Sequence, residues 1–193
     1  MMHPAFPRLA LAAALALGAA STAQAVEYGT LDNGASQVGF RYSQMGVTLD
    51  GQFQQFSAEL HFDPARPEAA STRFEVPLAS IDTGSPEGND EVKAKTWFDT
   101  TKHPVARFVS SSVKPLGSNR FEVTGQLSIK GKTREVSFPV TYTPGTPAAT
   151  FDGTLPLRRG DFSIGEGDWS SFDIVANKVD VTFHLVALPL ASK

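Results

Sequence analysis

The sequence predicts an all-β protein, an eight-stranded antiparallel up-and-down barrel with one short helix inserted between strands 3 and 4. Apolar and polar residues alternate in segment after segment, and this period of two is typical of strands with one buried and one solvated face. Short connections between the segments favour antiparallel neighbours over parallel βαβ units. Closing eight such strands into a barrel buries every apolar face and leaves no exposed edge.

The strongest strand pattern is a hairpin between residues 120 and 142. Apolar residues such as Phe121 before the turn and Phe138 after it occupy every second position, with polar residues between them. Gly131 and Lys132 supply the tight turn. A single hairpin is only marginally stable in water, so its apolar face needs further strands to cover it.

Six further segments show the same alternation and are predicted strands. They run over residues 37–45, 48–63, 73–78, 105–113, 150–158 and 178–188. Between residues 85 and 99 the period becomes helical and predicts a helix of about three turns. We expect Asn89 or Asp90 to cap this helix, and Glu91 to pair with Lys95 one turn later.

The first 25 residues predict an export signal that is cleaved after Ala25. Arg8 is followed by an apolar run over residues 9–20 and then by small residues, which is the order of regions in a secretory signal rather than in a core helix. The apolar run is shorter than the ~20 residues that span a bilayer. We therefore expect residues 26–193 to form one mature domain in a bacterial periplasm.

Composition limits the partners of this domain. The chain carries 17 Lys and Arg against 20 Asp and Glu, and losing Arg8 with the signal leaves a formal charge of −4. With no basic cluster, nucleic acid and anionic lipid surfaces are disfavoured as partners. The chain has no cysteine, which excludes disulfides and thiolate metal sites.

The interior of an eight-stranded barrel can be filled by side chains or can hold one small ligand. Nine phenylalanines on the apolar faces fit either a packed core or a lipophilic pocket, and the residue pattern alone leaves both open. These are Phe40, Phe56, Phe62, Phe74, Phe108, Phe121, Phe138, Phe151 and Phe183. An outer-membrane barrel fits poorly, because three Tyr and two Trp cannot build the two aromatic girdles that such barrels carry.

Motifs that carry chemistry are few. Residues 82–84 read Asp-Thr-Gly, the triplet of an aspartic protease, but two copies must meet for catalysis and a turn at a strand end explains a single copy better. His61, His103 and His184 lack any metal-ligand spacing. The acidic loop over residues 161–168 does not match a calcium-binding loop. We therefore expect neither a catalytic constellation nor a metal site.

The ordered motifs of the mature chain resemble those of the YceI-like family of exported lipid-binding barrels. The matching stretches span nearly the whole mature chain. They are residues 40–47 (FRYSQMGV), 51–62 (GQFQQFSAELHF) and 79–84 (ASIDTG), then Trp97-Phe98-Asp99 with His103-Pro104 and Phe108, then residues 123–132 (VTGQLSIKGK) and 159–165 (RGDFSIG). Many members carry Arg-Asp-x-His-Leu after the Asp-Thr-Gly turn, and this chain reads GNDEV at residues 88–92.

The resemblance implies a lipocalin-like barrel that holds a polyprenyl chain, an isoprenoid quinone or a fatty-acid-like amphiphile in an apolar channel. It favours a pocket over a packed core, and it implies no cofactor besides the bound lipid. Members of the family often pair as dimers, although no residue here marks a homodimer interface. The protein is expected to be a carrier that is not embedded in the membrane and is not an enzyme.

The expected ligand-binding residues share the apolar face of the barrel or lie at its mouth. For the channel wall they are Phe40, Tyr42, Phe56, Phe74, Val76, Phe108, Phe121, Val123, Phe138, Phe151 and Phe183, and for the mouth Met45, Trp97 and Phe98. Two alternatives remain open. A packed barrel could act through its loops, for example in a stress response, and an enzyme acting on bound lipid would need more polar groups inside than Tyr42, Ser110 and Ser112 provide.

Overall fold

The computed structural model describes residues 26–190. Residues 1–25 and 191–193 lie outside the described part of the chain, and so does the predicted export signal. Within residues 26–190 the chain forms eleven strands and one α-helix. The strands are β1 (Tyr28–Leu31), β2 (Gln37–Gln44), β3 (Val47–Phe53), β4 (Ser57–His61), β5 (Ser71–Pro77), β6 (Ile81–Asp82), β7 (Val105–Gly117), β8 (Arg120–Ile129), β9 (Lys132–Thr143), β10 (Ala149–Arg158) and β11 (Lys178–Pro189), and the helix is α1 (Pro86–Lys93).

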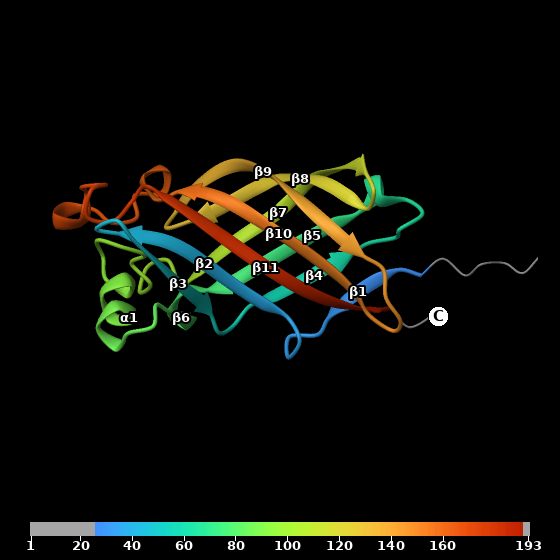
Figure 1. The fold of residues 1–193 in the computed structure, drawn as a ribbon, viewed down its shortest axis with the longest axis horizontal. Coiled ribbons are helices and arrows are strands. Elements are labelled where there is room, and N and C mark those ends of the chain that lie inside the picture. The colour runs from blue at the N-terminus through green and yellow to red at the C-terminus, as the bar shows by residue number, and fades with distance from the viewer. Residues whose placement is uncertain (1–25, 191–193) are drawn as a thin grey trace, which may run out of the picture.

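All strands belong to one antiparallel sheet that curls around an interior (Figure 1). The strand order is β4-β5-β7-β8-β9-β10-β11-β2-β3-β6, so most neighbours in the sheet are also neighbours in the sequence. Pairing of β11 with β2 joins the last strand to the first long one, with Val181 opposite Phe40. The predicted class, an all-β antiparallel barrel of lipocalin-like form, is confirmed, and the strand count of eight is wrong.

The three additional strands are short or interrupted. The predicted strand over residues 48–63 is split into β3 and β4, because β3 pairs with β2 whereas β4 pairs with β5 at the other end of the strand order. The chain therefore crosses from β3 to the other end of the strand order, and residues 54–56, which make this crossing, belong to no strand. Strands β1 and β6 span four and two residues, which is too short for alternation to be visible in the sequence.

The inserted helix is shorter than the predicted three turns, and its cap lies earlier than expected. Ser85, rather than Asn89 or Asp90, caps α1 by accepting a 2.9 Å hydrogen bond from the Gly88 amide. The side chain of Asn89 instead accepts a 2.6 Å hydrogen bond from the Thr83 amide. Because the helix ends at Lys93, Lys95 is beyond its last turn and the expected Glu91–Lys95 pair does not form.

One end of the barrel is closed by packed aromatic rings. The Phe62 ring centroid lies 4.9 Å from that of Tyr142, 5.0 Å from Phe151 and 5.5 Å from Phe121. Tyr28 of β1 stands edge-on to Tyr142 at 6.1 Å, and its backbone bridges to Phe62. All five rings are buried, so this end, where β1 meets β11 (Figure 1), is sealed by side chains.

Candidate ligand-binding cavity

The interior of the sheet contains a cavity of about 860 Å³. Its wall comes from the inner faces of the long strands together with α1 and the segment after β10, and most of its lining side chains are aliphatic or aromatic. Such a volume lies in the range of sites that enclose a small organic ligand, roughly 300 to 1,000 Å³. The barrel is therefore not a fully packed core.

Twelve of the fourteen residues predicted to bind ligand line this cavity. They are Phe40, Tyr42, Phe74, Val76, Trp97, Phe98, Phe108, Phe121, Val123, Phe138, Phe151 and Phe183. Strand alternation brings ten of them together, because every second side chain of a strand points to the same face of the sheet, whereas Trp97 and Phe98 come from the segment between α1 and β7. Burial raises the pKa of the Tyr42 phenol, in keeping with its apolar surroundings.

The other two predicted residues lie outside the lining. Met45 is 77% exposed and has a φ of 51° in the tight turn between β2 and β3, where alternation no longer governs the direction of the side chain. Phe56 is half-buried in the crossing between β3 and β4 and stacks on Phe74 with centroids 5.7 Å apart. It therefore contacts a lining residue without lining the cavity itself.

Several lining residues were missed by the sequence analysis. Phe53 of β3 and Ile81 of β6 line the cavity, and so do Phe162, Ile164 and Trp169 from the segment after β10. The sequence predicts only an acidic loop over residues 161–168, whereas Phe162 and Ile164 within it are buried. The sequence feature that could have predicted this burial is the pair Phe162 and Ile164, two apolar residues two positions apart among acidic ones.

Arg159 organises this segment from within. Its side chain is 3% exposed, and its guanidinium donates hydrogen bonds of 2.7 to 3.3 Å to six backbone carbonyls. These belong to Ile164, Gly165, Trp169, Ser171, Val175 and Ala176. No ion pair within residues 26–190 joins Arg159 to a carboxylate. Burial lowers its pKa, yet an arginine remains charged at any physiological pH.

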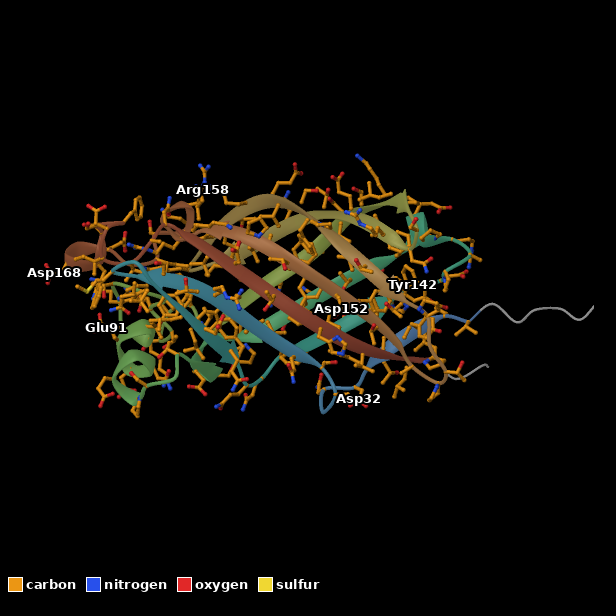
Figure 2. The ribbon with its side chains drawn as sticks, in the orientation of Figure 1. Asp32, Glu91, Tyr142, Asp152, Arg158 and Asp168 are labelled. Atoms are coloured by element: carbon orange, nitrogen blue, oxygen red, sulfur yellow. The ribbon has the colours of Figure 1, made fainter. Side chains whose placement is uncertain are left out.

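The helix and the segment after β10 meet at one end of the barrel. Glu91 of α1 accepts a 2.6 Å hydrogen bond from the Trp169 indole nitrogen, and the Thr96 carbonyl accepts from the amides of Gly165 (2.9 Å) and Glu166 (2.8 Å). Figure 2 shows Glu91 and Asp168 at this end, with Tyr142 toward the opposite one. These contacts hold the segment after β10 against α1 at the end opposite the aromatic rings.

Polar lining groups concentrate at the α1 end. Thr83, Ser85, Glu87 and Glu91 all line the cavity beside Arg159. Glu87 is exposed as well, so the cavity reaches the surface beside the helix. The walls along the long strands are mostly apolar. This distribution suits a ligand with a long apolar part and one polar end.

The candidate catalytic groups have structural roles. Asp82 accepts a 3.0 Å hydrogen bond from the Gly84 amide, and this bond lowers the pKa of its carboxyl, which confirms the turn interpretation of the Asp-Thr-Gly triplet. Among residues 26–190 no three His, Cys, Asp or Glu side chains gather as a metal site would require. The described helices include none that is long and apolar enough to cross a membrane.

The fold and the cavity together define a class of protein, antiparallel lipocalin-like β-barrels that enclose an apolar cavity. The chain belongs to the YceI-like family, since the model of the YceI-like domain matches residues 30–187. A protein named UPF0312 from Pseudomonas syringae pv. tomato is 33% identical over 184 residues, covering 91% of this chain and 94% of that protein. A UPF0312 protein from Azotobacter vinelandii is also 33% identical, over 79% of this chain and 85% of its own length.

Solved structures share the fold. BcnA from Burkholderia cenocepacia is 43% identical with a TM-score of 0.80, covering 82% of this chain and 99% of that chain. A structure from Saccharophagus degradans, described as a polyisoprenoid binding domain, is 17% identical with a TM-score of 0.65, covering 86% and 99%. At that identity the second likeness concerns the fold alone.

Proposed function

We propose that this protein binds an isoprenoid, either a polyprenyl chain or a quinone, or a similar long-chain amphiphile, and carries or sequesters it in the periplasm. The observation that carries the proposal is the apolar cavity of about 860 Å³ inside a barrel closed by aromatic rings at one end. The description of the Saccharophagus degradans domain as polyisoprenoid binding supports the same ligand class. The export pattern in residues 1–25 supports the compartment.

The burial free energy of a prenyl chain supports useful affinity. At ~0.8 kcal/mol per buried CH₂, one five-carbon unit contributes up to about 4 kcal/mol. Association costs roughly 4 to 15 kcal/mol. Three to five buried units contribute up to about 12 to 20 kcal/mol, which exceeds even the upper end of that cost from four units onward. The twelve predicted lining residues are proposed as the surface that these units contact, and binding rather than catalysis is proposed as the function.

Native mass spectrometry of protein expressed in the periplasm, followed by organic extraction and lipid identification, tests the proposal. A discrete added mass that matches a quinone or a polyprenyl species is the expected result. Bare protein that also fails to take up added quinone would instead favour a barrel that acts through its loops.

Two matched variants test whether lipid uptake depends on the cavity wall. Phe138→Asp places a charge on the buried face of β9 and should abolish uptake, because an unpaired carboxylate is costly in apolar surroundings. Ser137→Asp adds the same charge to the exposed neighbour on the opposite face and should leave uptake unchanged. Val123→Trp narrows the cavity without a charge and covers the case in which Phe138→Asp does not fold. Undiminished uptake by a folded Phe138→Asp and by Val123→Trp would contradict the assigned wall.

A further inference from the structure

The cavity ends at Phe62, which belongs to the cavity wall as well as to the aromatic end of the barrel. Phe62 lines the cavity and is 3% exposed, and its ring centroid lies 4.9 to 5.5 Å from those of Phe121, Tyr142 and Phe151. Phe121 and Phe151 also line the cavity, whereas Tyr142 is buried without lining it. Phe62 therefore separates the cavity from Tyr142, which lies toward the end away from α1 (Figure 2).

The register of the strands shows the same boundary. On β9 the inward residue Val140 lines the cavity, and the next inward residue, Tyr142, does not. On β11 the change falls between Leu185, which lines the cavity, and Ala187, which has no exposed surface. Phe151 of β10 pairs with Tyr142 on one side and with Leu185 on the other, so the boundary crosses neighbouring strands at nearly the same level. Buried side chains fill the barrel beyond this level.

A boundary at a fixed level limits how much of a long chain the cavity can enclose. Carbons inside the cavity are shielded from water, and carbons beyond its capacity must extend out beside α1, where the cavity reaches the surface. This limit applies whichever end of the ligand enters first. We propose that Phe62 sets the longest isoprenoid tail that the barrel encloses and is thereby a specificity-determining residue. The inference rests on the proposed function and narrows its ligand class by tail length.

The sizes of the side chains give the expected change in tail length. Phe62→Ala removes about six carbon atoms at the end of the cavity, close to the five of one prenyl unit. Space with apolar walls stays dry and accepts apolar ligand atoms, so the longest enclosed tail should grow by about one unit. In the opposite direction, Val140→Phe adds about four carbon atoms on the cavity side of the boundary and should shorten that tail by about one unit.

Extraction from donor vesicles measures the limit. Phosphatidylcholine vesicles hold equal amounts of benzoquinones whose tails lengthen in steps of one prenyl unit, and a second set holds polyprenols of the same lengths. Native mass spectrometry identifies which of them the protein extracts. A unit that moves from the bilayer into the cavity stays in apolar surroundings, whereas each unit that projects into water should lower the bound fraction about tenfold or more. The wild type should therefore extract tails up to a sharp upper length.

Three variants assign the limit to Phe62. Phe62→Ala should raise the upper length by about one unit and Val140→Phe should lower it by about one unit. Phe56→Ala is the matched control, because it removes the same ring from a residue that does not line the cavity, and it should leave the upper length unchanged. Val140→Phe retains the packing of Phe62 on its neighbouring rings and covers the case in which Phe62→Ala does not fold.

The inference and the proposed function fail in different ways. An unchanged upper length in a folded Phe62→Ala or in Val140→Phe would overturn the inference, and so would a shift in Phe56→Ala as large as in Phe62→Ala. A wild type that extracts every tail length equally would also overturn it and would leave the carrier function intact. A wild type that extracts neither quinones nor polyprenols of any length would overturn both.

Discussion

Replacement of Arg159 by lysine tests how the segment after β10 is held in place. Arginine has five N–H donors and lysine has three, whereas six backbone carbonyls accept hydrogen bonds from Arg159. Lysine keeps the charge but leaves at least three carbonyls without this partner. At about 1 kcal/mol for each lost hydrogen bond, Arg159→Lys should destabilise the protein by about 3 kcal/mol.

Urea and thermal unfolding measure this loss. For a domain of this size 1 kcal/mol corresponds to roughly 2 to 4 °C, so Tm should fall by roughly 6 to 12 °C on the same scaling. Arg158→Lys is the matched control, because Arg158 is the exposed preceding residue (Figure 2) and surface substitutions usually stay within about 0.5 kcal/mol. A loss for Arg159→Lys no larger than for Arg158→Lys would refute the reasoning and assign the stability to apolar packing of Phe162 and Ile164.

Three further predictions concern groups elsewhere in the barrel. Burial raises the pKa of Tyr142 to about 12, so stability present below pH 10 should fall as pH rises from 10 toward 12, by about 1 to 2 kcal/mol. Denaturant titrations should show this loss of stability, and the Tyr142→Phe variant should lose less stability over the same pH range. Gly153→Ala should cost about 1 to 3 kcal/mol in the same assay, because a Cβ there would overlap a Phe183 ring and lie 2.9 Å from the Pro139 carbonyl oxygen, whereas Gly34→Ala, with 3.4 Å of clearance, should cost less. The hydrogen bond from Lys130 lowers the pKa of Glu166 below its ordinary 4.5. The stability that the Lys130–Glu166 pair adds should therefore be fully present above pH 4.5 and should be lost as the pH falls below it. Tryptophan fluorescence that stays constant through that range would contradict a role for the pair in positioning the loop.

Alternation predicted the long strands well because their burial pattern repeats every two residues. In β8 and β9 the inward residues Phe121, Val123, Phe138 and Val140 are all buried, as the sequence pattern requires. The same rule could not reveal β1 or β6, which have too few residues to show a period. It also joined β3 to β4, although the inward positions change from odd numbers (Leu49, Phe53) to even numbers (Ala58, Leu60) at the crossing, where the partner strand changes.

The predictable part of the site is the part built by strands. Met45 and Phe56 were misplaced because they lie in a turn and in a crossing, where side-chain direction depends on local backbone angles. The role of Arg159 could not be predicted, because its partners are main-chain carbonyls and leave no trace in the sequence. The indole Nε1 of Trp97 is buried without a hydrogen-bond partner among the described residues, and this too was hidden, since only a folded environment shows whether a donor finds an acceptor.

The arrangement of contacts explains how a barrel of this size keeps an open interior. Lining rings of the wall contact one another across an intervening strand, with Phe138 of β9 5.4 Å from Phe108 of β7 and 5.8 Å from Phe183 of β11. Buried contacts hold the chain together at the two ends, through the aromatic rings around Phe62 at one and the hydrogen bonds of Arg159 to backbone carbonyls at the other. The backbone ladders and the contacts at the two ends thus keep the sheet curled around the cavity. It follows that substitutions in the wall should act mainly on which ligand fits, whereas substitutions at the ends should act mainly on stability.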